Sequence, residues 1–311
     1  MKYLYSFFLT ITACIWIPLL IFIFPLSLLF IIPYFIIGYV TPVKKFILTF
    51  ILFKTKPIKK YFWKFIYNKI ASKYDRSSWT CMNYGFSKPS GIFIKNNTSE
   101  IYCLQLYHYI TSGFLEYKDW KGKSLVEVGS GRGGGLSYIA KVFSPVLALG
   151  IDISQTQVDL CNSFHKQTNI KFIQGDAENL PVKDFSIDVV VNIESSHCYP
   201  NINRFLSEIR RILKPGGWFL YADFANPKII QDIEIGVVET GMKILKKQDI
   251  TENVLMSMDI ENERKVNEVV NIPWPFKQAY LEFSGVKDSV IYKEFQSRNI
   301  VYVAYVIQSN N

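Results

Sequence analysis

The chain has 311 residues, of which 49% are hydrophobic and 16% aromatic, enough for one sizeable core and an appendage. Its formal net charge of +9 is uneven, because residues 1–73 contain ten Lys but no Arg, Asp or Glu, while the remainder is nearly balanced. This uneven charge argues against a main domain that binds nucleic acid and favours contact with an anionic membrane surface. The five cysteines show no CxxC spacing, so we expect reduced thiols, no disulfide framework and no metal site.

The first segment, residues 1–43, has no charged side chain from Tyr3 to Val43. A bilayer core about 30 Å thick is crossed by about 20 helical residues, whereas this run as one helix would reach about 60 Å. Four prolines interrupt the run: Pro18, Pro25, Pro33 and Pro42. We therefore expect a membrane anchor of two short helices joined near Pro25 as a helical hairpin. A single span and a re-entrant hairpin are the alternatives.

The second segment, residues 44–73, interleaves lysines with Phe, Trp, Tyr and Ile side chains. This pattern is typical of a basic amphipathic segment that lies in the lipid headgroup layer, although packing on the protein's own domain is the alternative. Lysines flank the apolar run on both sides, and such flanks mark the cytosolic side of a membrane. We expect a membrane protein whose residues 74–311 face the cytosol, at the endoplasmic reticulum if the cell is eukaryotic.

Residues 74–311 alternate between two patterns. Short apolar runs, "SLVEV", "VLALGIDIS", "IKFIQGD", "SIDVVVNIE" and "WFLYADF", alternate with longer amphipathic ones such as "NINRFLSEIRRIL". This alternation predicts an α/β domain with a parallel sheet that helices cover on both faces. Ligands of such sheets bind beyond the carboxyl ends of the strands. We expect residues 225–278 to hold acidic and helical stretches that precede the last strands.

Five glycines crowd into "GSGRGGG", residues 129–135, directly after the first predicted strand. A glycine-rich turn at this place lets the backbone come close to a cofactor, and Asp152 ends the next strand, where a carboxylate can accept hydrogen bonds from ribose hydroxyls. A dinucleotide and S-adenosylmethionine both suit this plan. Glu127 favours S-adenosylmethionine, because its carboxylate would repel a pyrophosphate but suit a cationic amino acid moiety. Asp176 can accept a hydrogen bond from an adenine amine, and Ala177 leaves room for the ring.

As a set, "VEVGSGRGGG", "GIDIS", "GDAENLP" and "RILKPGGWF" resemble the motifs of class I S-adenosylmethionine-dependent methyltransferases, over about residues 75–305. More narrowly, "MNYGF", "ESSHCYPN" and "FLYADF" are similar to phthiotriolone and phenolphthiotriolone dimethyltransferases and to bacterial fatty-acid O-methyltransferases. The resemblance implies that residues 74–311 form a Rossmann-like, seven-stranded class I methyltransferase sheet with helices on both faces. It also implies S-adenosylmethionine as the cofactor and a long, lipid-like substrate.

The family lacks the long membrane segment as a general feature, so residues 1–73 are a departure from its pattern. The family also implies a lid before the first strand, with Tyr84 in contact with the cofactor. The predicted cofactor-binding residues are Tyr84, Glu127, Gly129, Gly131, Asp152, Asp176, Ala177 and Asn192.

The predicted catalytic residues are Glu194 and His197, which follow the fourth strand, and Asp223, which ends the fifth. A histidine with a pKa near 6.5 is a natural acceptor for an alcohol proton, and a neighbouring carboxylate can orient its ring. O-methylation requires little beyond alignment of the oxygen with the methyl group and removal of this proton. If the substrate is already a carboxylate, His197 would position it by hydrogen bonding.

The leading hypothesis is a membrane-anchored methyltransferase that acts on a hydroxyl or carboxylate of a lipid-like substrate. The first alternative is carbon methylation of a sterol or isoprenoid, in which a carboxylate such as Glu194 would shield a carbocation. The second is a non-enzymatic membrane scaffold with a degenerate methyltransferase fold. The sequence leaves the methyl acceptor and the oligomeric state open.

Overall fold

The structure is a computed structural model that describes residues 79–95, 98–114, 119–268 and 276–310. The chain divides into two compact units, Met1–Phe65 and Ile66–Asn311, and every described residue belongs to the second. The predicted membrane anchor, residues 1–43, and the predicted interfacial segment, residues 44–73, lie outside the described residues. None of the helices in the described part of the chain is both long enough and apolar enough to cross a membrane.

The described elements follow one another in the order expected for an α/β domain. The strands are β1 Ser124–Val128, β2 Leu147–Asp152, β3 Ile170–Gln174, β4 Ile187–Ile193, β5 Leu213–Ala225, β6 Met242–Asp249 and β7 Val301–Ser309. The helices are α5 Ile101–His108, α6 Gly134–Phe143, α7 Gln155–Phe164, α8 Ile202–Ile212, α9 Pro227–Glu239, α10 Thr251–Glu268, α11 Phe276–Ser284 and α12 Val290–Gln296. A π-helix, Tyr109–Phe114, extends α5, and a 3₁₀ turn, Ser196–Cys198, follows β4.

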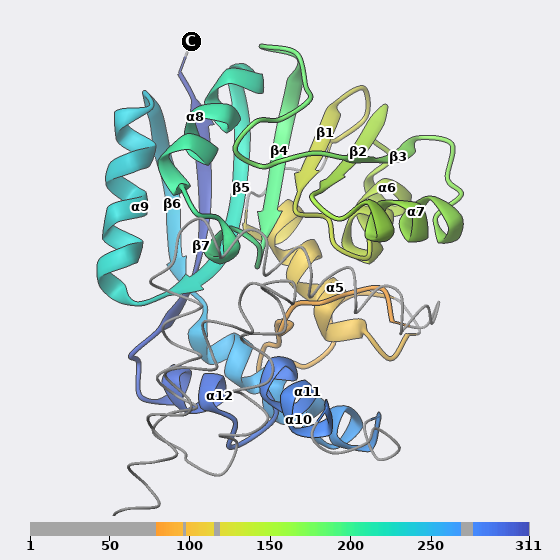
Figure 1. Cartoon of the computed structure of the whole chain (residues 1–311), viewed down its shortest axis with the longest axis vertical. Coiled ribbons are helices and arrows are strands. Elements are labelled where there is room, and N and C mark those ends of the chain that lie inside the picture. The colour runs from red at the N-terminus through yellow and green to blue at the C-terminus, as the bar shows by residue number, and fades with distance from the viewer. Residues whose placement is uncertain (1–78, 96–97, 115–118, 269–275, 311) are drawn as a thin grey trace, which may run out of the picture. The chain divides into compact units, whose positions relative to one another are not determined.

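The described strands form one seven-stranded sheet in the order β3-β2-β1-β4-β5-β7-β6 (Figure 1). The five strands from β3 to β5 are parallel, and β7 runs antiparallel between β5 and β6. The order reverses between β1 and β4, and crevices for ligands form at such switch points. The predicted seven-stranded sheet of the class I methyltransferase type is therefore confirmed.

Helices cover both faces of the sheet, because its strands are apolar on both sides. On one face, side chains such as Leu125 and Val191 pack with apolar residues of α5, α6 and α7. On the other face, the alternate residues Val126 and Val190 pack with those of α8 and α9. Each of these strands therefore contributes to two cores, which explains why the sequence shows continuous apolar runs.

Capping residues place the starts of the helices that frame the sheet. Ser154, Asn201 and Asn226 accept hydrogen bonds from backbone N–H groups at the starts of α7, α8 and α9. Pro227 occupies the first turn of α9, where a missing N–H costs nothing. These signals sit directly after strand ends, so the helices begin close to the edge where ligands bind.

The expectation for residues 225–278 is wrong in one element, because Met242–Asp249 forms β6 and not helix. This strand lies at the edge of the sheet and pairs with β7 alone. It carries three lysines, Lys243, Lys246 and Lys247, while Ile244 contacts the apolar core, and lysine is a common residue of edge strands. These lysines made the segment resemble the solvated surface of a helix.

Four helices cluster beyond the carboxyl ends of the parallel strands. In Figure 1 the arrowheads of β1 and β4 point toward the lower part of the picture, where α5, α10, α11 and α12 gather. Residues of α5, α10 and α12 belong to the same apolar core as the sheet. We call these four helices the cap, and the candidate site lies between the cap and the sheet.

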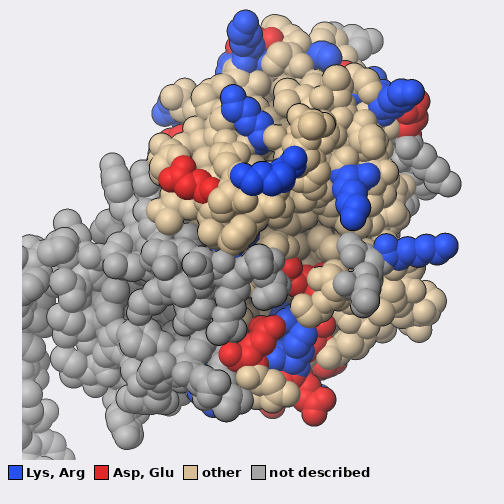
Figure 2. Space-filling model, turned by 90° about the vertical axis from the view of Figure 1, so that its right-hand side faces the viewer, with Lys and Arg blue, Asp and Glu red and all other residues tan. Residues whose placement is uncertain are grey.

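The charged side chains are dispersed on one face of the molecule. Figure 2 shows isolated Lys and Arg side chains on the upper part of this face, and acidic and basic side chains together near its lower edge. The described residues on this face form no continuous basic band of the kind that tracks nucleic-acid phosphates.

Candidate functional site

The glycine-rich loop crosses the ends of β1 and β2. Gly129, Gly131 and Gly133 all have positive φ angles of 74°, 51° and 76°, which only glycine adopts at little cost. Gly129 donates its N–H to the carbonyl of Ile151 at 2.7 Å, so the loop is fastened to the neighbouring strand. A Cβ on Gly129 would lie 1.8 Å from the hydroxyl oxygen of Ser195, so the loop also packs closely on the β4 end.

The last two glycines of the motif have a different role. A Cβ on Gly134 would lie 2.4 Å from Thr80 Oγ1, and one on Gly135 would lie 1.9 Å from the ring of Tyr107. Both glycines begin α6 and allow other segments to pack directly on its backbone. The crowding of glycine therefore serves helix packing as well as the bare turn that the sequence predicts.

Asp152 ends β2 and is buried beneath the loop. Its carboxylate accepts the N–H of Gly131 and the N–H of Ser154, both at 2.9 Å. Burial raises the pKa of Asp152 to about 6 in spite of these bonds. Asp176 lies beyond the end of β3, half-buried, and accepts the N–H of Glu178 at 3.0 Å, with Ala177 buried beside it. Both predicted adenosine-binding carboxylates therefore lie at the carboxyl ends of adjacent strands, Asp152 as the last residue of β2 and Asp176 just beyond β3.

Glu127 on β1 is fully buried. The hydroxyl of Tyr107 donates to its Oε1 at 2.6 Å, whereas its Oε2 has no hydrogen-bond partner among the described residues. Burial raises the pKa of Glu127 to about 8, and the nearby Asp152 adds to this rise. A buried carboxylate without a cation is costly, so this position suits a positively charged ligand.

Two further polar atoms near the loop are buried without a partner in the described structure. They are the hydroxyl of Ser130 and the side-chain oxygen of Asn192. The amide nitrogen of Asn192 is in use, since it donates to the carbonyl of Val128 at 2.8 Å and to Tyr199. Orphaned oxygens on β1, on β4 and in the loop between β1 and α6 indicate a polar ligand at this edge.

His197 and Asp223 form the most completely built pair of the site. His197 Nδ1 lies 2.8 Å from Asp223 Oδ1, and the backbone N–H of His197 donates to Oδ2 at 3.0 Å. The hydroxyl of Ser196 also donates to Oδ2, at 2.7 Å. The ring of His197 stacks on Phe224 with 4.5 Å between the centroids. The predicted pairing of this histidine with this carboxylate is present in the structure.

His197 and Asp223 each stabilise the charged form of the other. Burial would raise the pKa of Asp223, but His197 and the hydrogen bonds from His197 and Ser196 hold it below its ordinary value. Burial would lower the pKa of His197, but Cys198 and Asp223 raise it well above its ordinary value. An ionised Asp223 accepts hydrogen bonds only, so the proton of a neutral His197 lies on Nδ1 and Nε2 is left as an acceptor.

Glu194, the third predicted catalytic residue, has a different environment. It has a φ angle of 46° and accepts the backbone N–H of Tyr84 at 2.8 Å. Burial raises the pKa of Glu194 to about 8, with Asp223 adding to the rise. Tyr84, a predicted cofactor contact, packs its ring on Phe224 and Phe295, with centroids 5.7 and 6.0 Å apart. Tyr84 is therefore part of the wall beside His197.

Sequence reasoning missed several residues of the site. Tyr107 holds Glu127, and Tyr302 lies buried near Glu194 and Asp223, whose charges together with burial raise the pKa of its phenol. Tyr107 belongs to an apolar helix and Tyr302 to an apolar strand, so both resemble core residues. No local pattern distinguishes such a tyrosine from an ordinary packed one.

The chain matches known proteins over this region. A family model described as "Methyltransferase domain" matches residues 126–221. The chain is 35% identical over 204 residues to the phthiotriol/phenolphthiotriol dimycocerosates methyltransferase of Mycobacterium tuberculosis, which covers 65% of this chain and 74% of the relative. It is 34% identical over 200 residues to the fatty-acid O-methyltransferase of Mycolicibacterium smegmatis, which covers 63% and 71%.

A solved structure supports the fold independently. The crystal structure of the cyclase SpnF superposes with a TM-score of 0.65 over 81% of this chain and 96% of that one, at 17% identity. At this identity the likeness shows the fold alone.

The His197–Asp223 pair has a direct spectroscopic test. We expect Asp223→Asn to lower the pKa of His197 by about 1 to 3 pH units, because the nearby negative charge that favours the imidazolium is removed. A nitrogen-15 NMR titration of the imidazole measures this value. Ser196→Ala is the matched control, since it removes a hydrogen bond to Asp223 but keeps the charge. An unchanged pKa in Asp223→Asn would show that the carboxylate does not govern the histidine.

Proposed function

Because this chain belongs to the class I S-adenosylmethionine-dependent methyltransferases, we propose that it transfers the methyl group to an oxygen atom of a lipid-like acceptor. The observation that carries the proposal is the His197–Asp223 pair, built at the carboxyl ends of β4 and β5 beside the cofactor loop. The two mycobacterial relatives support the lipid class, since their names give phthiotriol/phenolphthiotriol dimycocerosates and fatty acids as substrates.

The described residues fit the cofactor. Its positive charge suits Glu127, whose buried Oε2 has no partner in the described structure. Asp152 would accept hydrogen bonds from the ribose hydroxyls, and Asp176 from the adenine amine, with Ala177 beside the ring. The unpartnered oxygens of Ser130 and Asn192 are available to further polar groups. S-adenosylmethionine, when bound, supplies an electrophilic methyl group on a sulfonium cation.

The role of His197 depends on the acceptor. For a hydroxyl acceptor, neutral His197 takes the proton at Nε2, while Asp223 fixes the ring and stabilises the imidazolium that forms. For a carboxylate acceptor no proton is removed, and charged His197 donates a hydrogen bond to the carboxylate. The raised pKa of His197 favours the charged form in the free protein, which suits the carboxylate acceptor.

Mutation of His197 tests this assignment. With a long-chain alcohol as acceptor, we expect His197→Ala to lower kcat by about 10² to 10⁴, the usual contribution of a general base. The rate of the unmutated enzyme should rise with pH through the raised pKa of His197, because only the neutral ring accepts a proton. With a fatty acid the rate should instead fall over the same range, because the imidazolium is lost.

The matched control is His108→Gln, since the contacts of His108 are with Tyr138 and Phe143 and not with His197 or Asp223. Its kcat should remain close to that of the unmutated enzyme. A small effect of His197→Ala with every oxygen acceptor would remove the proposed role and favour carbon methylation.

We also infer that residues 1–43 anchor the enzyme in a membrane and that residues 44–73 lie in the headgroup layer. The support is the sequence alone: an uncharged run of 41 residues followed by lysines interleaved with aromatic side chains. A lipid acceptor in the bilayer would then reach the site without crossing water, with residues 74–311 on the cytosolic side.

The anchor can be tested on isolated membranes. We expect the full chain to remain in the membrane fraction after washing with alkaline carbonate, because hydrophobic spans resist this treatment whereas electrostatic contacts do not. Immunoblotting of pellet and supernatant gives the result. Complete release into the supernatant would contradict the anchor and leave only surface attachment through residues 44–73.

A further inference from the structure

A segment without regular secondary structure, residues 79–87, crosses the edge of the site and is called the strap here. Its first residues pack on the glycine-rich loop: Gly134 donates its N–H to the carbonyl of Thr80 at 3.0 Å. The guanidinium of Arg132 lies 4.8 Å from the ring centroid of Trp79 and donates to its carbonyl. Met82 lies over Gly131, where a Cβ would come within 2.7 Å of its methyl group. The strap thus covers the cofactor loop directly.

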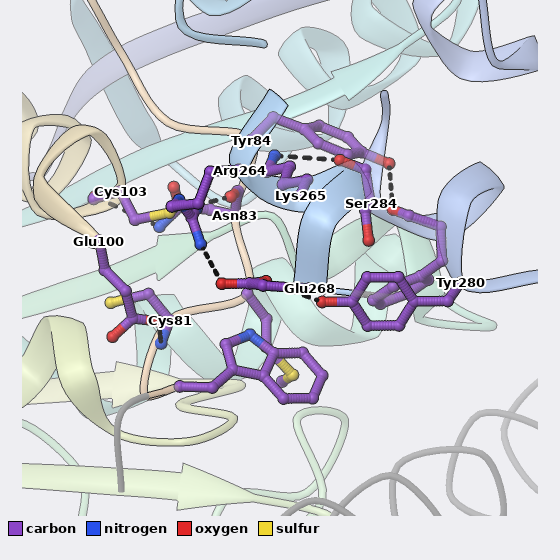
Figure 3. A pocket seen from close by; sticks show the side chains of 13 residues that line it. Cys81, Asn83, Tyr84, Glu100, Cys103, Arg264, Lys265, Glu268, Tyr280 and Ser284 are labelled. Atoms are coloured by element: carbon purple, nitrogen blue, oxygen red, sulfur yellow. Dashed lines mark hydrogen bonds and ion pairs between the residues drawn. The ribbon is translucent and has the colours of Figure 1, made fainter. Parts of the chain in front are cut away.

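The far end of the strap is fastened to the cap. Ser257 on α10 donates its hydroxyl to the carbonyl of Tyr84 at 3.0 Å, and Ser87 donates its N–H to the carbonyl of Asn253. Gly85 has a φ of 83°, and a Cβ there would lie 2.3 Å from the Ser257 hydroxyl. Figure 3 shows Tyr84 beside Lys265 and Ser284, which join α10 to the end of α11 through a 3.0 Å hydrogen bond. Helix α10 of the cap therefore holds the far end of the strap by hydrogen bonds.

Glu194 links the sheet to the strap. Its carboxylate accepts the backbone N–H of Tyr84 at 2.8 Å, across 110 residues of sequence. Its own N–H donates to the carbonyl of Ala222 at 2.9 Å, so its backbone is held by the strand next to β4. Its positive φ of 46° is uncommon for glutamate, so the surrounding structure must offset the strain of this backbone conformation. This geometry aims the carboxylate at the strap.

We propose that Glu194 is a positioning residue that latches the strap closed over the cofactor loop. It acts through Tyr84, whose ring packs on Phe224, and Phe224 in turn stacks on His197. The bond from Tyr84 to Glu194 thereby holds two parts of the site at once. One is the strap over the cofactor loop, and the other is the aromatic packing of Tyr84 and Phe224 beside His197. This inference rests on the proposed function, because it assigns a role within the same site.

A hydrogen-bond acceptor, and not a negative charge, is what this latch requires. The raised pKa of Glu194, caused by burial and by Asp223, agrees with a carboxyl group that is partly neutral near pH 8. Glutamine has the same shape as the neutral acid and also presents an oxygen to the Tyr84 N–H. Glu194→Gln keeps the acceptor oxygen but cannot ionise, whereas Glu194→Ala removes both. Comparing the two variants therefore shows whether Glu194 acts as a hydrogen-bond acceptor or as a group that ionises or transfers a proton.

The first experiment is hydrogen–deuterium exchange on the full chain without cofactor. We expect Glu194→Ala to increase exchange of the strap amides, that of Tyr84 above all, by tenfold or more, and Glu194→Gln to restore protection. Glu208→Ala is the matched control, because Glu208 accepts the N–H of Leu180 at 2.7 Å on the opposite side of the sheet. It should leave the exchange of the strap unchanged. Unaltered exchange in Glu194→Ala would overturn the latch.

The second experiment measures S-adenosylmethionine affinity and turnover separately. We expect Glu194→Ala to weaken binding by about tenfold, the usual scale for losing a hydrogen bond to a carboxylate, with a smaller effect on kcat. Glu194→Gln should bind and turn over almost normally. A Gln variant with normal binding but a large loss of kcat would show that Glu194 takes part in the chemistry, and this too overturns the proposal.

The two experiments also separate this proposal from the proposed function. The exchange measurement needs no cofactor, so loss of strap protection in Glu194→Ala supports the latch whatever the enzyme methylates. If the unmutated chain binds S-adenosylmethionine but methylates no oxygen, the proposed function fails. The latch fails instead if Glu194→Ala leaves the exchange of the strap amides unchanged.

Discussion

The burial of two carboxyl groups at the carboxyl ends of the central strands is the constraint on which the rest of the site depends. Glu127, the last residue but one of β1, and Asp152, the last residue of β2, are buried, and burial raises the pKa of both. The backbone N–H groups and the tyrosine hydroxyl around them are neutral and only partly offset the cost of two adjacent carboxylates. A cationic ligand would stabilise the ionised carboxylates, so its binding would offset this cost.

The parallel sheet makes this arrangement possible. Parallel strands bring all their carboxyl ends to one edge, so residues distant in sequence meet without long loops. Asp223 reaches His197 because β5 pairs with β4 in a register that sets Ile193 against Ala222. The cap closes the same edge, and Tyr84 and Phe224 extend the apolar core up to the histidine. A site of this kind combines charge for the donor with an apolar wall for a lipid acceptor.

The parts of this structure that obey local patterns could be predicted from the sequence. Strand and helix alternate with clear periodicity, so Asp152 could be placed at the end of β2, and Asn192 and Asp223 within two residues of the ends of β4 and β5. The pairing of His197 with Asp223 followed from the adjacency of β4 and β5. The edge strand β6 was not predicted, because its lysines follow no pattern that distinguishes a solvated strand from the exposed face of a helix.

Contacts between distant, ordinary-looking residues could not be predicted. The Tyr107–Glu127 bond, the packing of Thr80 on Gly134 and the Glu194–Tyr84 bond each depend on how a preceding segment folds over the sheet. Nothing in the composition of residues 79–87 marks them as a cover. The sequence predicted a lid only through resemblance to a family, and the structure supplies the bonds that hold it.

Calorimetric titration of the full chain with S-adenosylmethionine tests the central claim most directly, in buffers of different ionisation enthalpy. A cation beside Glu127 should lower its raised pKa, so binding should release a proton near pH 7.5 and tighten as the pH rises toward about 8. Glu127→Gln should bind more weakly and release no such proton. Absence of S-adenosylmethionine binding, or binding by the unmutated chain without proton release, would contradict the account.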